Sequence, residues 1–151
     1  MKKQFLFFLF CLCAGVSNVW AQETDWSPLV RVSKHINLNI ENDETYPWQL
    51  ADGILTNTNK GVSNSTSTFK MSFTCEALTV VQWNYSVKSE QNYDKLTIRH
   101  NDRVLGTYSG VVNFTLYSMY VSAGTHEFTF TYSKDGSNDN NGDDVQISGI
   151  S

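Results

Sequence analysis

Apolar and polar residues alternate along most of the chain. Neighbouring side chains of a β-strand point to opposite faces, so this period of two predicts strands with one buried face. Seven runs show the alternation, and polar turn residues separate them. They are 35–40, 68–75, 81–87, 95–100, 112–116, 126–132 and 145–147. Several short strands with regular turns predict an all-β chain folded as an antiparallel two-sheet β-sandwich.

The phase of each run predicts which side chains face the core. In the run 126–132, Phe128, Phe130 and Tyr132 share one face, and in 81–87 Trp83 is on the apolar face. The run 112–116 is expected to bury Val112, Phe114 and Leu116. The stretch 51–69 is rich in Ser, Thr and Asn, and much of it is expected to form an ordered surface loop.

The N-terminus has the layout of a secretory signal peptide. A short basic start precedes a near-continuous apolar run from Phe5 to Val16, and Val19 and Ala21 fit a small-residue cleavage site. The apolar run is too short for a stable membrane span. We therefore expect residues 1–21 to be removed during export.

Cleavage divides the chain into a short lead and one domain. Residues 22–34 are expected to be a leader or a peripheral strand, and residues 35–151 a single β-sandwich domain. The mature chain would be secreted or held at the cell surface, with the periplasm as a further possibility. The oligomeric state stays open.

Composition limits the classes of partner. Removal of 21 residues leaves 130, and the loss of Lys2 and Lys3 changes the formal charge from −4 to −6. This acidic balance argues against nucleic acid and against an anionic membrane surface. Of the three Cys only Cys75 remains, so no internal disulfide can form and the core must supply the stability.

Nothing in the sequence assembles a catalytic set, and we expect a non-catalytic protein. His35, His100 and His126 are far apart and fit no metal spacing, and no nucleophile elbow or phosphate-binding loop is present. His126 shares its register with the Phe residues of its run and is expected to be structural. Cys75 is expected to be a buried, unreactive thiol.

The acidic tract near the C-terminus has the oxygen ligands that Ca²⁺ prefers. Asp135, Asp139, Asp143 and Asp144 lie close together in sequence, with three Asn among them. The spacing does not fit an EF-hand loop, because Ser148 stands where the closing Glu would be. Taken alone, the tract is either a calcium site or a solvated turn.

Two motifs resemble those of CUB domains. The first is Tyr93-Asp94 followed by Leu96 and Ile98, and the second is a late Asp135-x-Ser137 loop that ends in Gly142. The chain is also similar to jelly-roll modules in secreted proteins of Bacteroidota and other bacteria. The residues that carry this likeness are Ser89-Glu90, Tyr93-Asp94, Leu96, Ser109-Gly110, Gly124, His126, Phe130, Tyr132, Lys134-Asp135 and Ser137.

The resemblance implies a CUB-like or jelly-roll fold with a structural Ca²⁺ between the two motifs. It points to Asp94 and Asp135 as the best ligands, and the further candidates are Glu90, Asp143 and Asp144. Such an ion would tie residues 88–94 to residues 133–144. CUB domains usually carry disulfides and a further carboxylate where this chain has Ser86. The alternative is that Asp94 accepts hydrogen bonds from loop amides and joins the loops without an ion.

Aromatic residues raise a second binding hypothesis. Trp48 and Tyr46 lie outside any strand register and form either a cap on the sandwich or a surface for sugar rings. Tyr117 and Tyr120 lie where the alternation changes phase, so one of them is expected to be exposed. We therefore expect a non-catalytic binding or adhesion module for an extracellular protein or glycan. The alternative is a carbohydrate-binding module that uses Trp48.

Overall fold

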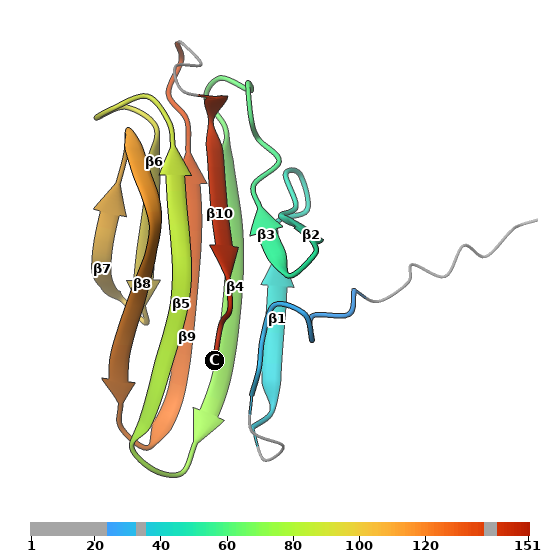
Figure 1. The fold of residues 1–151 in the computed structure, drawn as a ribbon, viewed down its shortest axis with the longest axis vertical. Helices are drawn as coiled ribbons and strands as arrows, with labels where there is room; N and C mark the ends of the chain where they lie inside the picture. Colours follow the sequence, from blue (N-terminus) through green and yellow to red (C-terminus); the bar gives the residue numbers. More distant parts are fainter. Residues whose placement is uncertain (1–23, 33–35, 138–141) are drawn as a thin grey trace, which may run out of the picture.

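The computed structural model describes residues 24–32, 36–137 and 142–151, and this part of the chain forms ten strands (Figure 1). The predicted signal peptide lies outside the described residues, as do residues 33–35 and 138–141. The strands are β1 (Leu38–Asn42), β2 (Gln49–Ala51), β3 (Ile54–Thr56), β4 (Thr66–Cys75), β5 (Thr79–Lys88), β6 (Lys95–His100), β7 (Arg103–Tyr108), β8 (Val111–Val121), β9 (Gly124–Ser133) and β10 (Asp144–Ser148).

The strands form two five-stranded antiparallel sheets, which pack face to face as a jelly-roll β-sandwich (Figure 1). One sheet has the order β1-β4-β9-β6-β7, and the other has the order β2-β3-β10-β5-β8. The inward phase of the alternation supplies the core, in which Trp83, Phe128, Phe130 and Tyr132 are fully buried. Cys75 is buried as well. The predicted fold class is confirmed.

The polar stretch 51–69 differs from the surface loop that its composition predicts. It contains β3, whose Leu55 is fully buried, and it buries Asn57 and Asn59. The two Asn side chains bond each other at 3.0 Å, and Asn57 Oδ1 accepts the amide of Val145 at 2.8 Å. Asn59 Nδ2 donates to Ser65 Oγ at 3.1 Å. Burial of these polar groups is tolerated because each has a partner.

A β-bulge in β8 reverses the predicted phase of that strand. Tyr85 pairs with Thr115 and Val87 with Val112, so β8 has one residue more than β5 between these pairs. As a result Phe114 and Leu116 are 53% and 59% exposed, and the prediction that they are buried is wrong. Beyond the bulge the inward positions are Tyr117, Met119 and Val121, which lie opposite inward residues of β5. Tyr120 points outward and is 70% exposed, as expected for one of the two tyrosines.

The described part of the N-terminal segment, residues 24–32, packs on the sandwich. Leu29 and Val30 are buried, and Val30 forms a parallel bridge with Ile150. The bridge is held by the bonds from Arg31 N to Ile150 O at 2.8 Å and from Ile150 N to Leu29 O at 3.0 Å. Within the described ranges there is no helix long and apolar enough to cross a membrane.

Candidate functional site

A buried ionic cluster lies between the sheets at the end of the sandwich where β9 ends and β6 and β10 begin. The Lys134 ammonium is 3.0 Å from Asp94 Oδ2 and 2.5 Å from Asp143 Oδ2. None of the three side chains has any exposed surface. A cation and two carboxylates are therefore held together out of contact with water.

Strand periodicity explains why these three residues meet. Each lies two residues from the terminal inward-pointing residue of its strand, so its side chain also points inward. Lys134 follows Tyr132 of β9, Asp94 precedes Leu96 of β6, and Asp143 precedes Val145 of β10. Because β6 and β10 belong to opposite sheets, the two carboxylates approach Lys134 from different sides of the core.

Backbone and hydroxyl donors hold Asp94 in place. Asp94 Oδ1 accepts the amide of Asp135 at 2.9 Å. The Asp94 carbonyl accepts Ser89 Oγ–H at 2.8 Å, and its amide bonds the Glu90 carbonyl at 3.2 Å. The expectation that Asp94 joins the two loops by accepting a loop amide is confirmed.

Asp143 is fixed by Tyr132 and by its own backbone. The Tyr132 hydroxyl donates to Asp143 Oδ1 at 3.1 Å. Burial, and secondly the negative charge of Asp143, raise the pKa of the Tyr132 phenol, so Tyr132 stays a donor at neutral pH. Asp143 has φ of 50°, and its carbonyl accepts Asn57 Nδ2 at 3.1 Å. Asp143 therefore presents a carboxylate of defined orientation to Lys134.

The other predicted calcium ligands do not join this cluster with their carboxylates. Asp135 is half-buried and bonds the Ser137 amide at 2.9 Å. Asp144 points to the outer face of β10, 3.9 Å from Lys60 Nζ. Glu90 is half-buried, and its Oε2 has no hydrogen-bond partner among the described residues.

Calcium binding stays a prediction. In the part of the chain that the structure describes, no group of three or more His, Cys, Asp or Glu could hold a metal ion. The cation between Asp94 and Asp143 is instead the Lys134 ammonium. In the sequence Lys134 belongs to the second motif, and its position two residues after Tyr132 of β9 also indicates a buried side chain.

Trp48 is not an exposed aromatic. It is 2% exposed and belongs to the core, so the prediction of a sugar-binding surface at Trp48 and Tyr46 is wrong for Trp48. The Asn42 side chain clamps this segment, because it donates to Trp48 O and accepts from Trp48 N, both at 2.8 Å. Tyr46 is half-buried, and its carbonyl accepts Ser67 Oγ. The segment packs its Trp48 side chain into the core.

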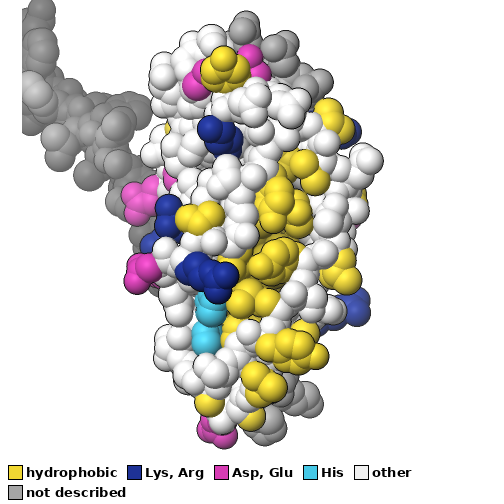
Figure 2. Space-filling view, turned by 90° about the vertical axis from the view of Figure 1, so that its left-hand side faces the viewer, with side chains coloured by type: hydrophobic (Ala, Val, Ile, Leu, Met, Phe, Trp, Pro, Cys, Tyr) yellow, Lys and Arg dark blue, Asp and Glu magenta, His cyan; other side chains and the backbone are white. Residues whose placement is uncertain are grey.

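Partly buried aromatic and aliphatic residues instead collect where the edge strands β7 and β8 lie on the same side of the sandwich. Figure 2 views the molecule from that side and shows hydrophobic side chains as a strip along it, with histidine and Lys or Arg beside it. We call this set the edge strip. Its members on β7 and β8 are Leu105, Tyr108, Val112, Tyr117 and Met119.

Tyr117 lies flat in the edge strip. Its ring stacks on the fully buried Trp83 with centroids 4.7 Å apart and planes at 15°. Trp83 is on β5, and Tyr117 is half-buried on the outermost strand β8, so Tyr117 lies at the open edge of its sheet. Nearby, the rings of Tyr85 and Tyr108 are 4.5 Å apart and share a hydrogen bond. Burial, and secondly this bond, raise the pKa of the Tyr85 phenol.

Two histidines lie beside the edge strip at the end of β6. His126 Nε2 is 2.9 Å from the Ser122 carbonyl, which can only accept, so this nitrogen carries the proton. His126 Nδ1 then accepts from His100 Nε2, also at 2.9 Å. The His100 ring stacks on Phe128. Burial, then the charges of His126 and Arg103, lower the pKa of His100. The structural role expected for His126 is thus observed, with His100 as its partner.

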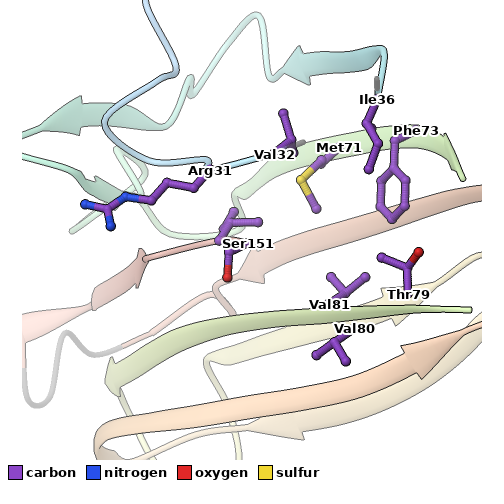
Figure 3. Close-up of a pocket in the computed structure, with 10 residues that line it drawn as sticks. Arg31, Val32, Ile36, Met71, Phe73, Thr79, Val80, Val81 and Ser151 are labelled. Atoms are coloured by element: carbon purple, nitrogen blue, oxygen red, sulfur yellow. The ribbon is translucent and has the colours of Figure 1, made fainter. Parts of the chain in front are cut away.

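A separate apolar pocket of about 160 Å³ lies on the other side of the molecule, between β4 and β5 (Figure 3). Val32, Met71 and Phe73 lie on one side of it and Val81 on the other, and Arg31 extends away from them. Ligand pockets in proteins usually have about 300–1,000 Å³ and several polar groups. This pocket is smaller and almost wholly apolar, so we assign no ligand to it.

Comparison with known proteins gives the fold. No protein-family model matches the sequence, and no curated protein is significantly similar to it. The structure is similar to part of the secreted serine protease VesC from Vibrio cholerae, with a TM-score of 0.63 and 17% identity. That match covers 75% of this chain and 24% of VesC, so this chain spans about a quarter of the length of that protein.

Weaker likenesses are to TmCBM61 in complex with β-1,4-galactotriose and to a family 35 carbohydrate-binding module from Clostridium thermocellum. Their TM-scores are 0.41 and 0.38, at 10% and 8% identity. The matches cover 75% and 74% of this chain, and 85% and 90% of the two modules. At 17% identity the likeness to VesC shows the fold alone.

Proposed function

We propose that the protein is an extracellular, non-catalytic carbohydrate-binding module whose ligand lies on the edge strip. The observation that carries this proposal is the half-buried Tyr117 ring, which stacks on Trp83 and lies on the outermost strand of its sheet. An aromatic ring in this position can pack against the apolar C–H face of a pyranose.

The surroundings of Tyr117 favour a sugar over a purely apolar ligand. Small-molecule sites combine an aromatic surface with a few polar groups that orient the ligand. Here the Tyr108 phenol, His100 and the exposed Arg103 border the same edge and can bond sugar hydroxyls. Because stacking already orients the Tyr117 ring, little conformational entropy would be lost on binding.

Recognition of an extracellular protein is the second candidate, and the opposite face of β8 favours it. Leu116 and Tyr120 of β8 and Val80 of β5 are 59%, 70% and 44% exposed on the outer face. Charged residues and proline usually protect an edge strand from pairing with another chain. The eleven residues of β8 include neither. The exposed side chains would place a protein partner on the outer face, and the unprotected backbone of β8 would allow a strand of that partner to pair along the edge.

Two tyrosines of one strand separate these candidates. We expect Tyr117→Ala to reduce affinity for the glycan at least tenfold and Tyr120→Ala to leave it unchanged, because their side chains point in opposite directions. Binding of the full chain to a glycan array would identify the ligand, and calorimetry would give the affinities. Thermal unfolding would confirm that both variants are folded.

The opposite pattern would contradict the proposal. If Tyr120→Ala abolished glycan binding and Tyr117→Ala did not, the edge strip would not be the site. If the array showed no binding at all, the carbohydrate proposal would fail. Capture of a protein partner that depended on Tyr120 would then favour the second candidate.

A further inference from the structure

We propose that Lys134 and Asp143 condense to form an intramolecular isopeptide bond. The Lys134 amino group is 2.5 Å from Asp143 Oδ2, and both side chains are sealed from solvent. Asp94 provides a second carboxylate at 3.0 Å from the same nitrogen, also without exposed surface. The structure thus holds an amine, the carboxyl group with which it can react and a proton carrier in one dry compartment.

The reaction balances without a cofactor. Lys134 Nζ attacks Cγ of Asp143, the new C–N bond forms, and the bond from Cγ to Oδ2 breaks. Of the three protons of the Lys134 ammonium, one stays on the amide nitrogen and two leave with Oδ2 as a water molecule. Nothing is oxidised or reduced, so the chain itself contains every group that the reaction needs.

Asp94 is placed to move the protons. Its Oδ2 accepts a hydrogen bond from Lys134 Nζ, so it can take a proton from the nitrogen during attack and return it to the departing oxygen. Its Oδ1 is held by the Asp135 amide at 2.9 Å, which prevents the carboxylate from turning away.

Tyr132 is placed to stabilise the intermediate. Attack on Cγ places negative charge on Asp143 Oδ1, and the Tyr132 hydroxyl already donates to this atom at 3.1 Å. A donor directed at the atom where charge develops lowers the barrier of acyl transfer. Tyr132 can serve in this way because burial keeps its phenol protonated.

The dry setting favours the amide. Buried charges lose their hydration, and condensation replaces an ammonium and a carboxylate by a neutral amide. Well-oriented intramolecular groups react as if at effective concentrations of about 10⁵–10⁸ M. The exposed pair Lys70 and Glu41, at 3.7 Å, lacks both advantages because water surrounds it.

Tryptic cleavage reports the bond directly. After Arg103 the next basic residue is Lys134, and no Lys or Arg follows it. Digestion of the denatured full chain without the bond yields the peptides 104–134 and 135–151. With the bond, Lys134 is no longer a trypsin site, and we expect one peptide 104–151 that lacks the mass of one further water molecule.

Variants identify the residues that take part in the reaction. Lys134→Arg retains a positive charge and a trypsin site but has no acylable amine, so it should give two unmodified peptides. Asp143→Ala should do the same, and Asp94→Ala should slow or abolish the mass loss while Lys70→Arg leaves it unchanged. If these variants fail to fold, the wild-type peptides alone decide.

A cyclic imide at Asp135-Gly136 would also lose one water. Incubation at mildly alkaline pH before digestion hydrolyses an imide and leaves an amide intact. Persistence of the lighter 104–151 peptide, with fragment ions joining Lys134 to Asp143, supports the proposal. The two unmodified peptides from the wild type, or a mass loss that alkali reverses, would overturn it.

Discussion

At one end of the sandwich Lys134 is held between Asp94 and Asp143, and at the other end His100 and His126 share one hydrogen bond. Both sets lie against the core, and β9 connects them, since His126 and Lys134 follow the same inward phase of that strand and its extension. Before any condensation of Lys134 with Asp143, the first set is ionic and depends on opposite charges. The second depends on His126 Nδ1 being unprotonated, because this atom accepts the hydrogen bond that His100 Nε2 donates.

The difference shows which changes each end can tolerate. Loss of one member of a buried ionic set leaves an uncompensated charge, which is costly. Loss of a neutral partner leaves one hydrogen bond unmade, which costs less. We therefore expect substitutions to lower the stability most at the ionic end. A fall in pH should lower it through the histidine end.

The largest effect should follow from Lys134→Met. Whether Lys134 is a free ammonium or is joined to Asp143, its replacement leaves Asp94 and Asp143 as two buried carboxylates without a partner, so we expect the free energy of unfolding to fall by about 3–5 kcal/mol. Urea unfolding at neutral pH measures it. The matched control is Lys70→Met, which removes an exposed ion pair with Glu41 and should cost less than about 1 kcal/mol.

A triple variant sharpens this test. Lys134→Met combined with Asp94→Asn and Asp143→Asn removes all three charges, and it should recover part of the lost stability. Equal losses for Lys134→Met and Lys70→Met would show that the ionic end is not a charged cluster in solution.

The sequence predicted most strands because a two-sheet sandwich buries alternate residues. This reasoning failed in β8, where the bulge inserts one residue opposite Ser86 and moves Phe114 and Leu116 to the outer face. Such a shift depends on pairing with β5, which is remote in sequence. It also failed for Asn57, because a buried Asn is stable only when its polar groups have partners, and its partner Val145 comes from a remote part of the chain.

The candidate sites were predictable only in part. Resemblance indicated that the loops around Asp94 and Asp135 meet, and the amide of Asp135 does bond Asp94. The alternation of buried and exposed positions adds a second signal. Asp94, Lys134 and Asp143 are in phase with the buried residues of their strands, whereas Asp144 is not. The edge strip could not be predicted, because Tyr117 points inward only as a consequence of the bulge.

The effect of Ca²⁺ on stability should be intermediate in size between those of Lys134→Met and of histidine protonation. Ca²⁺ at the ionic end would have to displace Lys134 from between Asp94 and Asp143, whereas Lys134→Met leaves both carboxylates available. We expect Ca²⁺ to stabilise the variant more than the wild type, by about 2.7 kcal/mol if its concentration reaches a hundred times Kd. Thermal unfolding with EDTA and then with excess Ca²⁺ tests this. A larger shift in the wild type would instead support the calcium site predicted from the sequence.

Protonation of the histidine end should give the smallest effect. The pKa of His100 is lower in the folded protein than in the unfolded chain, where it is about 6.5. Between these two pKa values the unfolded chain binds more protons, so stability is complete above about pH 7.5 and falls as pH drops through the unfolded pKa. Urea unfolding between about pH 7.5 and 5.5 should show this decline, and His100→Gln should flatten it because one titrating ring is lost. An unchanged slope in His100→Gln would assign the decline to other groups and would remove the contrast between the two ends.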